Sequence, residues 1–163
     1  LILEKLNLKK NKIKFVMKKF YFLIFIWIFF PLQAVSQEAF LSLKKNKVNV
    51  RYGPSFESQI KYVYKKINLP IKQIDKKENF RRIIDLKNNS GWIHVSQLKK
   101  INSIISLEDK ILFKKPSNFS KPLAKIKEGR ILIVQKCNGI WCKVKSENFK
   151  GWIKTNNIWG VIN

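Results

Sequence analysis

The stretch SGWIHVSQL, residues 90–98, is similar to a second stretch later in the chain, KGWIKTNNI, residues 150–158. The Gly-Trp pair that begins at Gly91 thus recurs at Gly151, 60 residues later. Self-similarity at such a distance indicates two copies of one small structural unit. We therefore expect a first unit at residues 37–99, a linker at residues 100–109 and a second unit at residues 110–163.

Short alternating runs of apolar residues fill both copies. Val48 and Val50 alternate with polar neighbours in the first copy, and Ile131 and Ile133 stand two positions apart in an apolar run of the second. Alternation at a period of two is typical of half-buried strands, and turn residues such as Gly, Pro and Asn recur every 8–12 positions. This pattern predicts an all-β fold made of small barrels or sandwiches.

The net charge is strongly positive. The chain of 163 residues has 34 Lys and Arg against 10 Asp and Glu, a net charge of +24. Such a charge attracts the protein to anionic surfaces. An alternative explanation is compositional bias, because Lys, Ile, Asn and Phe are abundant together. No block of like charges resembles a nucleic-acid-binding tail.

The N-terminal region resembles a secretory signal. Met17 and two lysines precede eleven apolar residues at 20–30, and Ala34 and Ser36 stand where a signal peptidase would require small residues. We expect residues 1–36 to be a leader whose true start is Met17 and whose apolar segment forms a helix in transient contact with the membrane. This predicts a periplasmic protein. The alternative is an uncleaved anchor in the inner membrane, although the apolar segment is short for a span of about 20 residues.

The string VNVRYGPS at residues 48–55, followed by SGWIHVSQL, resembles the bacterial SH3 domain family. Its members typically read N-V-R-x-G-P at the first strand and G-W-V or G-W-I near the last. The two-copy layout, with a basic chain and a C-x4-C hairpin, is similar to exported tandem SH3 proteins of Gram-negative bacteria. The resemblance implies two SH3-like β-barrels in tandem that bind peptidoglycan or a protein partner. In the second copy, KILFKKPSN keeps only Pro116 and Ser117 of the first-strand motif.

Candidate ligand-binding residues gather around the intact first motif. Tyr52 and Phe56 flank the predicted turn, and we expect them to form an aromatic groove with Arg51, Tyr62 and Tyr64. Lysines and arginines around this groove would pair with the carboxylates of peptidoglycan stem peptides or with phosphates of the envelope.

Three tryptophans are expected to be structural. Trp92, Trp141 and Trp152 would fill the centres of barrels that are too small to do without large rings. The alternative role for Trp92 is to stack against a ligand.

Cys137 and Cys142 are the two cysteines of the chain, and they flank the hairpin signal at Asn138 and Gly139. Export places them in an oxidising compartment, where we expect a disulfide. Metal binding would need further ligands. The single histidine, His94, has no nearby partner in the sequence, and neither a phosphate-binding loop nor a dinucleotide fingerprint is present.

These features favour a non-catalytic periplasmic protein that binds peptidoglycan or envelope peptides, without a cofactor or a metal. The alternative is a protein–protein assembly module of an envelope complex, in which the charge has no binding role. A third hypothesis, a basic nucleic-acid-binding protein, conflicts with the export signal, so we expect no nucleic-acid partner.

Overall fold

The computed structural model describes residues 39–160. The expected leader at residues 1–36 lies outside these residues. Within the described part of the chain, no helix combines the length and the apolar character needed to cross a membrane.

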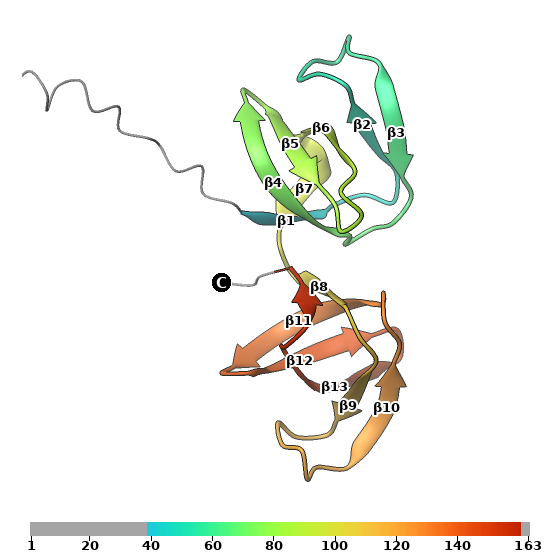
Figure 1. Ribbon diagram of the computed structural model, residues 1–163, viewed down its shortest axis with the longest axis vertical. Coiled ribbons are helices and arrows are strands. Elements are labelled where there is room, and N and C mark those ends of the chain that lie inside the picture. Colours follow the sequence, from blue (N-terminus) through green and yellow to red (C-terminus); the bar gives the residue numbers. More distant parts are fainter. Residues whose placement is uncertain (1–38, 161–163) are drawn as a thin grey trace, which may run out of the picture. The chain divides into compact units, whose positions relative to one another are not determined.

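Fourteen strands and one short 3-10 helix build the described chain (Figure 1). The first barrel consists of β1 (Phe40–Leu43), β2 (Val48–Arg51), β3 (Ile60–Tyr64), β4 (Pro70–Lys77), β5 (Phe80–Ile84), β6 (Ser90–His94), η1 (Val95–Gln97) and β7 (Leu98–Lys100). The second barrel consists of β8 (Ser103–Ser106), β9 (Lys110–Phe113), β10 (Pro122–Ile126), β11 (Ile131–Asn138), β12 (Trp141–Ser146), β13 (Phe149–Lys154) and β14 (Ile158–Trp159).

The two barrels have the same topology. The first sheet has the strand order β3-β2-β6-β5-β4-β1-β7, and the second has the order β10-β9-β13-β12-β11-β8-β14. Each strand of the second sheet therefore occupies the place of the strand seven positions earlier in the chain, and all of these pairings are antiparallel. The duplication and the tandem all-β fold expected from the sequence are confirmed.

The expected linker at residues 100–109 is wrong, because it contains the first strand of the second barrel. All four residues of β8 are buried, and this strand pairs with β11 and β14. Its sequence, SIIS, shows no alternation since both of its faces are covered. The connection between the barrels is therefore only residues 101–102, and the second barrel begins at Ser103.

A small polar network joins β1 to β8. The hydroxyls of Ser42 and Ser103, both fully buried, lie 2.7 Å apart. Ser103 donates its hydroxyl proton to the carbonyl oxygen of Asn68 at 2.6 Å, and the backbone N–H of Asn102 donates to the hydroxyl of Ser42. These bonds satisfy the two buried serines, which would otherwise be costly to remove from water.

Aliphatic residues fill both barrels. Val48 and Val50 are fully buried, as their alternation predicted, and they pack with five other residues of the first core, which are Leu43, Ile71, Ile83, Ile93 and Leu98. The second core is equivalent and consists of Ile104, Leu112, Ile126, Leu132, Cys142, Val144 and Ile153.

The prediction that tryptophans fill the barrel centres is wrong. Trp92, Trp141 and Trp152 are only half-buried and belong to neither core. Successive residues of a strand point to opposite faces, so the burial of Ile93 turns its neighbour Trp92 outward. In the same way, Cys142 is buried and its neighbour Trp141 faces outward. Ile153 is buried and its neighbour Trp152 faces outward.

The glycines that precede Trp92 and Trp152 mark close approaches of two strands. A Cβ atom on Gly91 would collide with Cγ1 of Val50 and lie 3.0 Å from the carbonyl oxygen of Arg51. A Cβ atom on Gly151 would lie 2.6 Å from the carbonyl oxygen of Phe113. The Gly-Trp motif is therefore needed where β6 meets β2 and where β13 meets β9.

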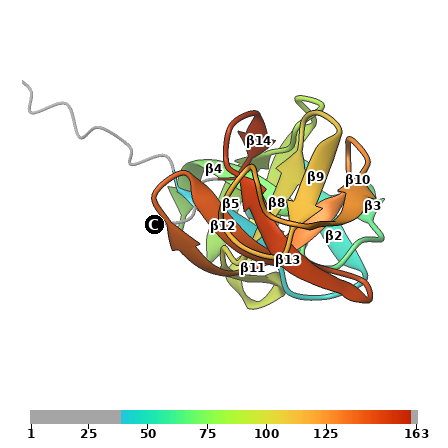
Figure 2. The ribbon, with the colours of Figure 1, turned by 90° about the horizontal axis from the view of Figure 1, so that it is seen from below.

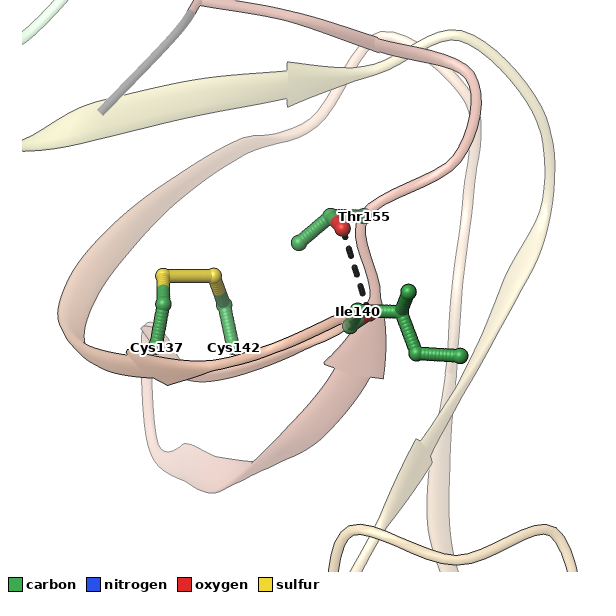
Figure 3. The surroundings of a disulfide bond; sticks show 4 residues. All are labelled: Cys137, Ile140, Cys142 and Thr155. Atoms are coloured by element: carbon green, nitrogen blue, oxygen red, sulfur yellow. Dashed lines mark hydrogen bonds between the residues drawn. A yellow bond between two sulfur atoms is a disulfide. The ribbon is translucent and has the colours of Figure 1, made fainter. Parts of the chain in front are cut away.

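The predicted disulfide is confirmed. Cys137 and Cys142 stand opposite each other in the register of β11 and β12, with Cα atoms 4.1 Å apart (Figure 3). Cys142 belongs to the core, whereas Cys137 is exposed. At the tip of this hairpin, the carbonyl oxygen of Ile140 accepts hydrogen bonds from the backbone N–H and the hydroxyl of Thr155.

Substitution of Gly91 by Ala is expected to lower the free energy of unfolding by about 1–3 kcal/mol, because the added methyl group overpacks the junction of β2 and β6. Urea denaturation measures this change. Gly53→Ala is the matched control, since the closest atom to its added methyl group is the hydroxyl of Ser58, which can rotate away. Equal stability of Gly91→Ala and the wild type would show that the close approach is not a constraint.

Reduction of the disulfide is expected to lower the free energy of unfolding by about 2 kcal/mol, because the bridge closes a short loop. Denaturation with and without a reductant measures the difference. Cys137→Ser, measured in both conditions, is the control that should not respond. A loss much larger than this value would contradict the expectation.

Candidate functional site

A row of large side chains crosses the outer face of the first barrel. Trp92 on β6 stands in register between Arg51 on β2 and Arg82 on β5. Directly paired residues share one face of a sheet, so both arginines lie on the outward side with the indole ring. The row is a direct consequence of the inward position of Gly91 and Ile93, which are buried.

A pocket of about 300 Å³ is centred on this row. It is lined by Arg51, Tyr52, Lys61, Arg82, Ser90, Gly91 and Trp92. We call it the cationic pocket. Three of its side chains carry a positive charge and none carries a negative one, so it favours an anionic group.

Two of the three cations are held in place. Arg51 donates from Nη1 to the carbonyl oxygen of Ser58 at 2.6 Å. Lys61 donates from Nζ to the carbonyl oxygen of Ser90 at 3.0 Å, and its ammonium lies 5.6 Å from the centre of the Tyr52 ring. These contacts orient the cations without neutralising them, because the acceptors are carbonyl oxygens and an aromatic face.

Arg82 is the most available of the three. It is exposed, and among residues 39–160 it forms neither an ion pair nor a hydrogen bond. Asp75 stands opposite it in the register, but this carboxylate accepts a hydrogen bond from the backbone N–H of Lys76. The guanidinium of Arg82 thus keeps its five donors for a ligand.

A second carboxylate, that of Glu57, lies near the pocket without lining it. The hydroxyl of Ser55 donates to Glu57 and, together with the backbone N–H of Glu57, holds the pKa of this carboxyl below its usual range. The positive charge of Arg51 contributes a smaller part of that shift. Glu57 therefore stays ionised and adds a negative charge close to one side of the pocket.

The structure brings together only part of the predicted groove. Arg51 and Tyr52 line the cationic pocket as expected, and Phe56 lies beside it, with the Arg51 guanidinium 5.8 Å from its ring centre. Phe56 is 59% exposed and packs against Phe80 and His94, with ring centres 5.3 and 4.8 Å away.

Tyr62 and Tyr64 do not line this pocket. They pair with Val50 and Val48 and pack against the first core, so they point inward. The hydroxyl of Tyr64 donates to the Asp85 carboxylate at 2.9 Å, and burial raises the pKa of both tyrosines. Their role in the fold is therefore to pack the core and to hold Asp85.

Asp85 stabilises the turn that leads into the Gly-Trp motif. Its carboxylate accepts from the backbone N–H of Lys87 and of Asn89, each at 2.9 Å. This arrangement supports the positive φ of 62° at Asn88. The turn in this way positions β6, which carries Trp92.

The predicted groove lacks five of the pocket residues, and three of these have large side chains, namely Lys61, Arg82 and Trp92. The signal for two of them is present in the sequence, since alternation from the buried Ile83 and Ile93 puts Arg82 and Trp92 on the outer face. Lys61 has no such signal, because its position depends on how the chain turns after the first motif.

The pocket is suited to binding. Within the described part of the chain, no group of three or more His, Cys, Asp or Glu residues could hold a metal ion. Guanidinium and ammonium groups around an aromatic face recognise carboxylate or phosphate groups and pack against apolar parts of a ligand.

A comparison with a family model agrees with the fold. The model of the family "Bacterial SH3 domain" matches residues 44–100 and 109–160. Two solved structures, NlpC2 and NlpC1 from Trichomonas vaginalis, are each 11% identical and have TM-scores of 0.37 and 0.36. The alignments cover 78% and 77% of this chain but only 50% and 47% of those chains, so this chain spans about half of their length. No curated protein matches.

Each matched segment covers most of one of the two barrels of identical topology. This chain belongs to the bacterial SH3 domain family and carries two copies of the domain in tandem.

Proposed function

We propose that this protein is a non-catalytic, periplasmic binding protein whose first barrel binds an anionic group of peptidoglycan. The observation that carries the proposal is the cationic pocket, in which three cations surround the half-buried Trp92. Membership in the bacterial SH3 family supports a cell-wall-related binding role.

The chemistry of the pocket matches a peptide that ends in a carboxylate. The unpaired guanidinium of Arg82 can form two parallel hydrogen bonds with a carboxylate. The rings of Tyr52 and Trp92 offer apolar surface to the adjoining methylene and methyl groups. Peptidoglycan stem peptides carry both kinds of group, which is why we prefer them to a simple inorganic anion.

Export of the protein is part of the proposal. A leader that ends at Ser36 would deliver the barrels to the compartment where peptidoglycan is exposed, and it would make the disulfide stable there. N-terminal sequencing of the native protein is expected to begin near Gln37. A native N-terminus upstream of the apolar segment would instead support the anchored alternative.

Arg82→Gln is expected to weaken binding of the full chain to purified peptidoglycan sacculi about threefold to tenfold, since one charge-assisted contact is lost. A co-sedimentation titration measures the apparent affinity, which should also fall at high salt.

Arg81→Gln is the matched control for charge. It removes the same charge from the next position, where the guanidinium is turned to the carbonyl oxygens of Glu78 and Phe80. Sacculi that fail to retain the wild type at low salt would refute wall binding. Recovery of the protein with a defined envelope protein after digestion of the wall would support the assembly module instead.

A further inference from the structure

The second barrel has a cationic aromatic face of its own, which the proposed function does not use. It lies on the outward side of β9, β11, β12 and β13, which are neighbouring strands of the second sheet. The course of these strands can be followed in Figure 2. Its members are Phe113, Lys136, Trp141, Lys143, Trp152 and Lys154. We call it the Trp–Lys face.

The strand register alternates aromatic and cationic side chains across this face. Trp141 pairs with Lys154, and Lys143 pairs with Trp152. Lys143 also pairs with Lys136 on its other side. The inward residues of the same strands, among them Val144, are buried in the core, so these aromatic and cationic side chains project to the outside.

Direct contacts organise the face. The ammonium of Lys136 lies 5.7 Å from the centre of the Trp152 ring, and that of Lys154 lies 5.7 Å from the centre of the Trp141 ring. Phe113 meets Trp141 edge to face, with ring centres 5.8 Å apart. The cations are thus held next to the rings by attraction to their negative faces, without a carboxylate partner.

The charge of the face is uncompensated. Strands β9, β11, β12 and β13 contain neither Asp nor Glu. Lys145 and Lys150, also paired with each other and exposed, extend the positive surface. The lysines of the second barrel that do form ion pairs, such as Lys110 and Lys125, bond to Glu108 and Asp109 in the loop before β9.

This face is not a copy of the cationic pocket. By strand order, Trp141 takes the place of Phe80 and Phe113 takes the place of Arg51. In the first barrel Phe56 packs on Phe80, which is only 5% exposed. In the second barrel Trp141 stays half-buried, while Phe119 of the loop after β9 is fully exposed.

We propose that the Trp–Lys face binds an acidic polysaccharide. Neighbouring strands place its cations about 5 Å apart, and alternate residues along a strand place them about 7 Å apart. Such a grid matches a polymer with regularly repeated carboxylates better than a single anion. The half-buried rings between the cations offer apolar contact to the C–H groups of sugar rings.

The geometry favours a glycan over a single-stranded nucleic acid. Nucleic-acid bases stack on open aromatic faces. Here the faces of Trp141 and Trp152 are approached by the ammonium groups of Lys154 and Lys136, so a stacked base would have to displace a cation from each ring.

The test measures binding of the full chain to polygalacturonate by isothermal titration calorimetry, with neutral dextran as the uncharged comparison. We expect the double substitution Lys143→Gln and Lys154→Gln to lower the affinity about tenfold, roughly threefold for each lost charge contact. The dependence of the affinity on salt should also become less steep.

Two controls separate this inference from the proposed function. Lys65→Gln with Lys66→Gln removes the same charge from exposed positions of the first barrel and should leave polygalacturonate binding unchanged. Arg82→Gln should weaken binding to sacculi but not to polygalacturonate. Unchanged melting temperatures show that the variants are folded.

The proposal is overturned if polygalacturonate does not bind, or if the double variant binds it as well as the wild type. It is equally overturned if a 20-nucleotide oligothymidylate, or vesicles of phosphatidylcholine with 30% phosphatidylglycerol, bind more tightly than polygalacturonate and lose that binding in the double variant.

Discussion

The close approach of two strands at each Gly-Trp motif is the constraint on which the rest of the structure depends. β6 pairs with β2 at the single position Trp92–Arg51, and β13 pairs with β9 at Trp152–Phe113. The absence of a side chain on Gly91 leaves room for Val50 in the core. Since successive side chains alternate between the faces, the same geometry turns each tryptophan outward, where it becomes part of a binding surface.

The two barrels share one topology, but their outward faces carry different side chains. In the first barrel the tryptophan lies between two arginines and beside Lys61, which gives a compact pocket suited to one anionic group. In the second barrel Phe113 replaces Arg51, and lysines alternate with indole rings over a broader surface. Apart from Cys142, the buried residues of both cores are aliphatic, so the two outer faces differ in chemistry while the cores are alike.

Most of the fold follows from the alternation of apolar residues and the spacing of motifs in the sequence. The two predictions that the structure contradicts, for the tryptophans and for the linker, fail for physical reasons. The alternation of Val48 and Val50 identified a core-facing strand, and the distance between the Gly-Trp motifs identified the duplication. Ring size predicts that the tryptophans fill the barrel centres, but the burial of Ile93 and Ile153 requires Trp92 and Trp152 to face outward. The strand β8 cannot be recognised from alternation, because all four of its residues are buried.

The sequence by itself determined the all-β class, the two repeats and the disulfide, because these depend on periodicity, motif spacing and a hairpin whose cysteines are neighbours. Only the tertiary structure decided which side chains meet. Tyr62 and Tyr64 were grouped with Tyr52 from their proximity in the chain, but the pairing of β3 with β2 turns them toward the core. Arg51, Lys61 and Arg82 come from three different strands, and they form one pocket because the register of β2, β5 and β6 places them around Trp92.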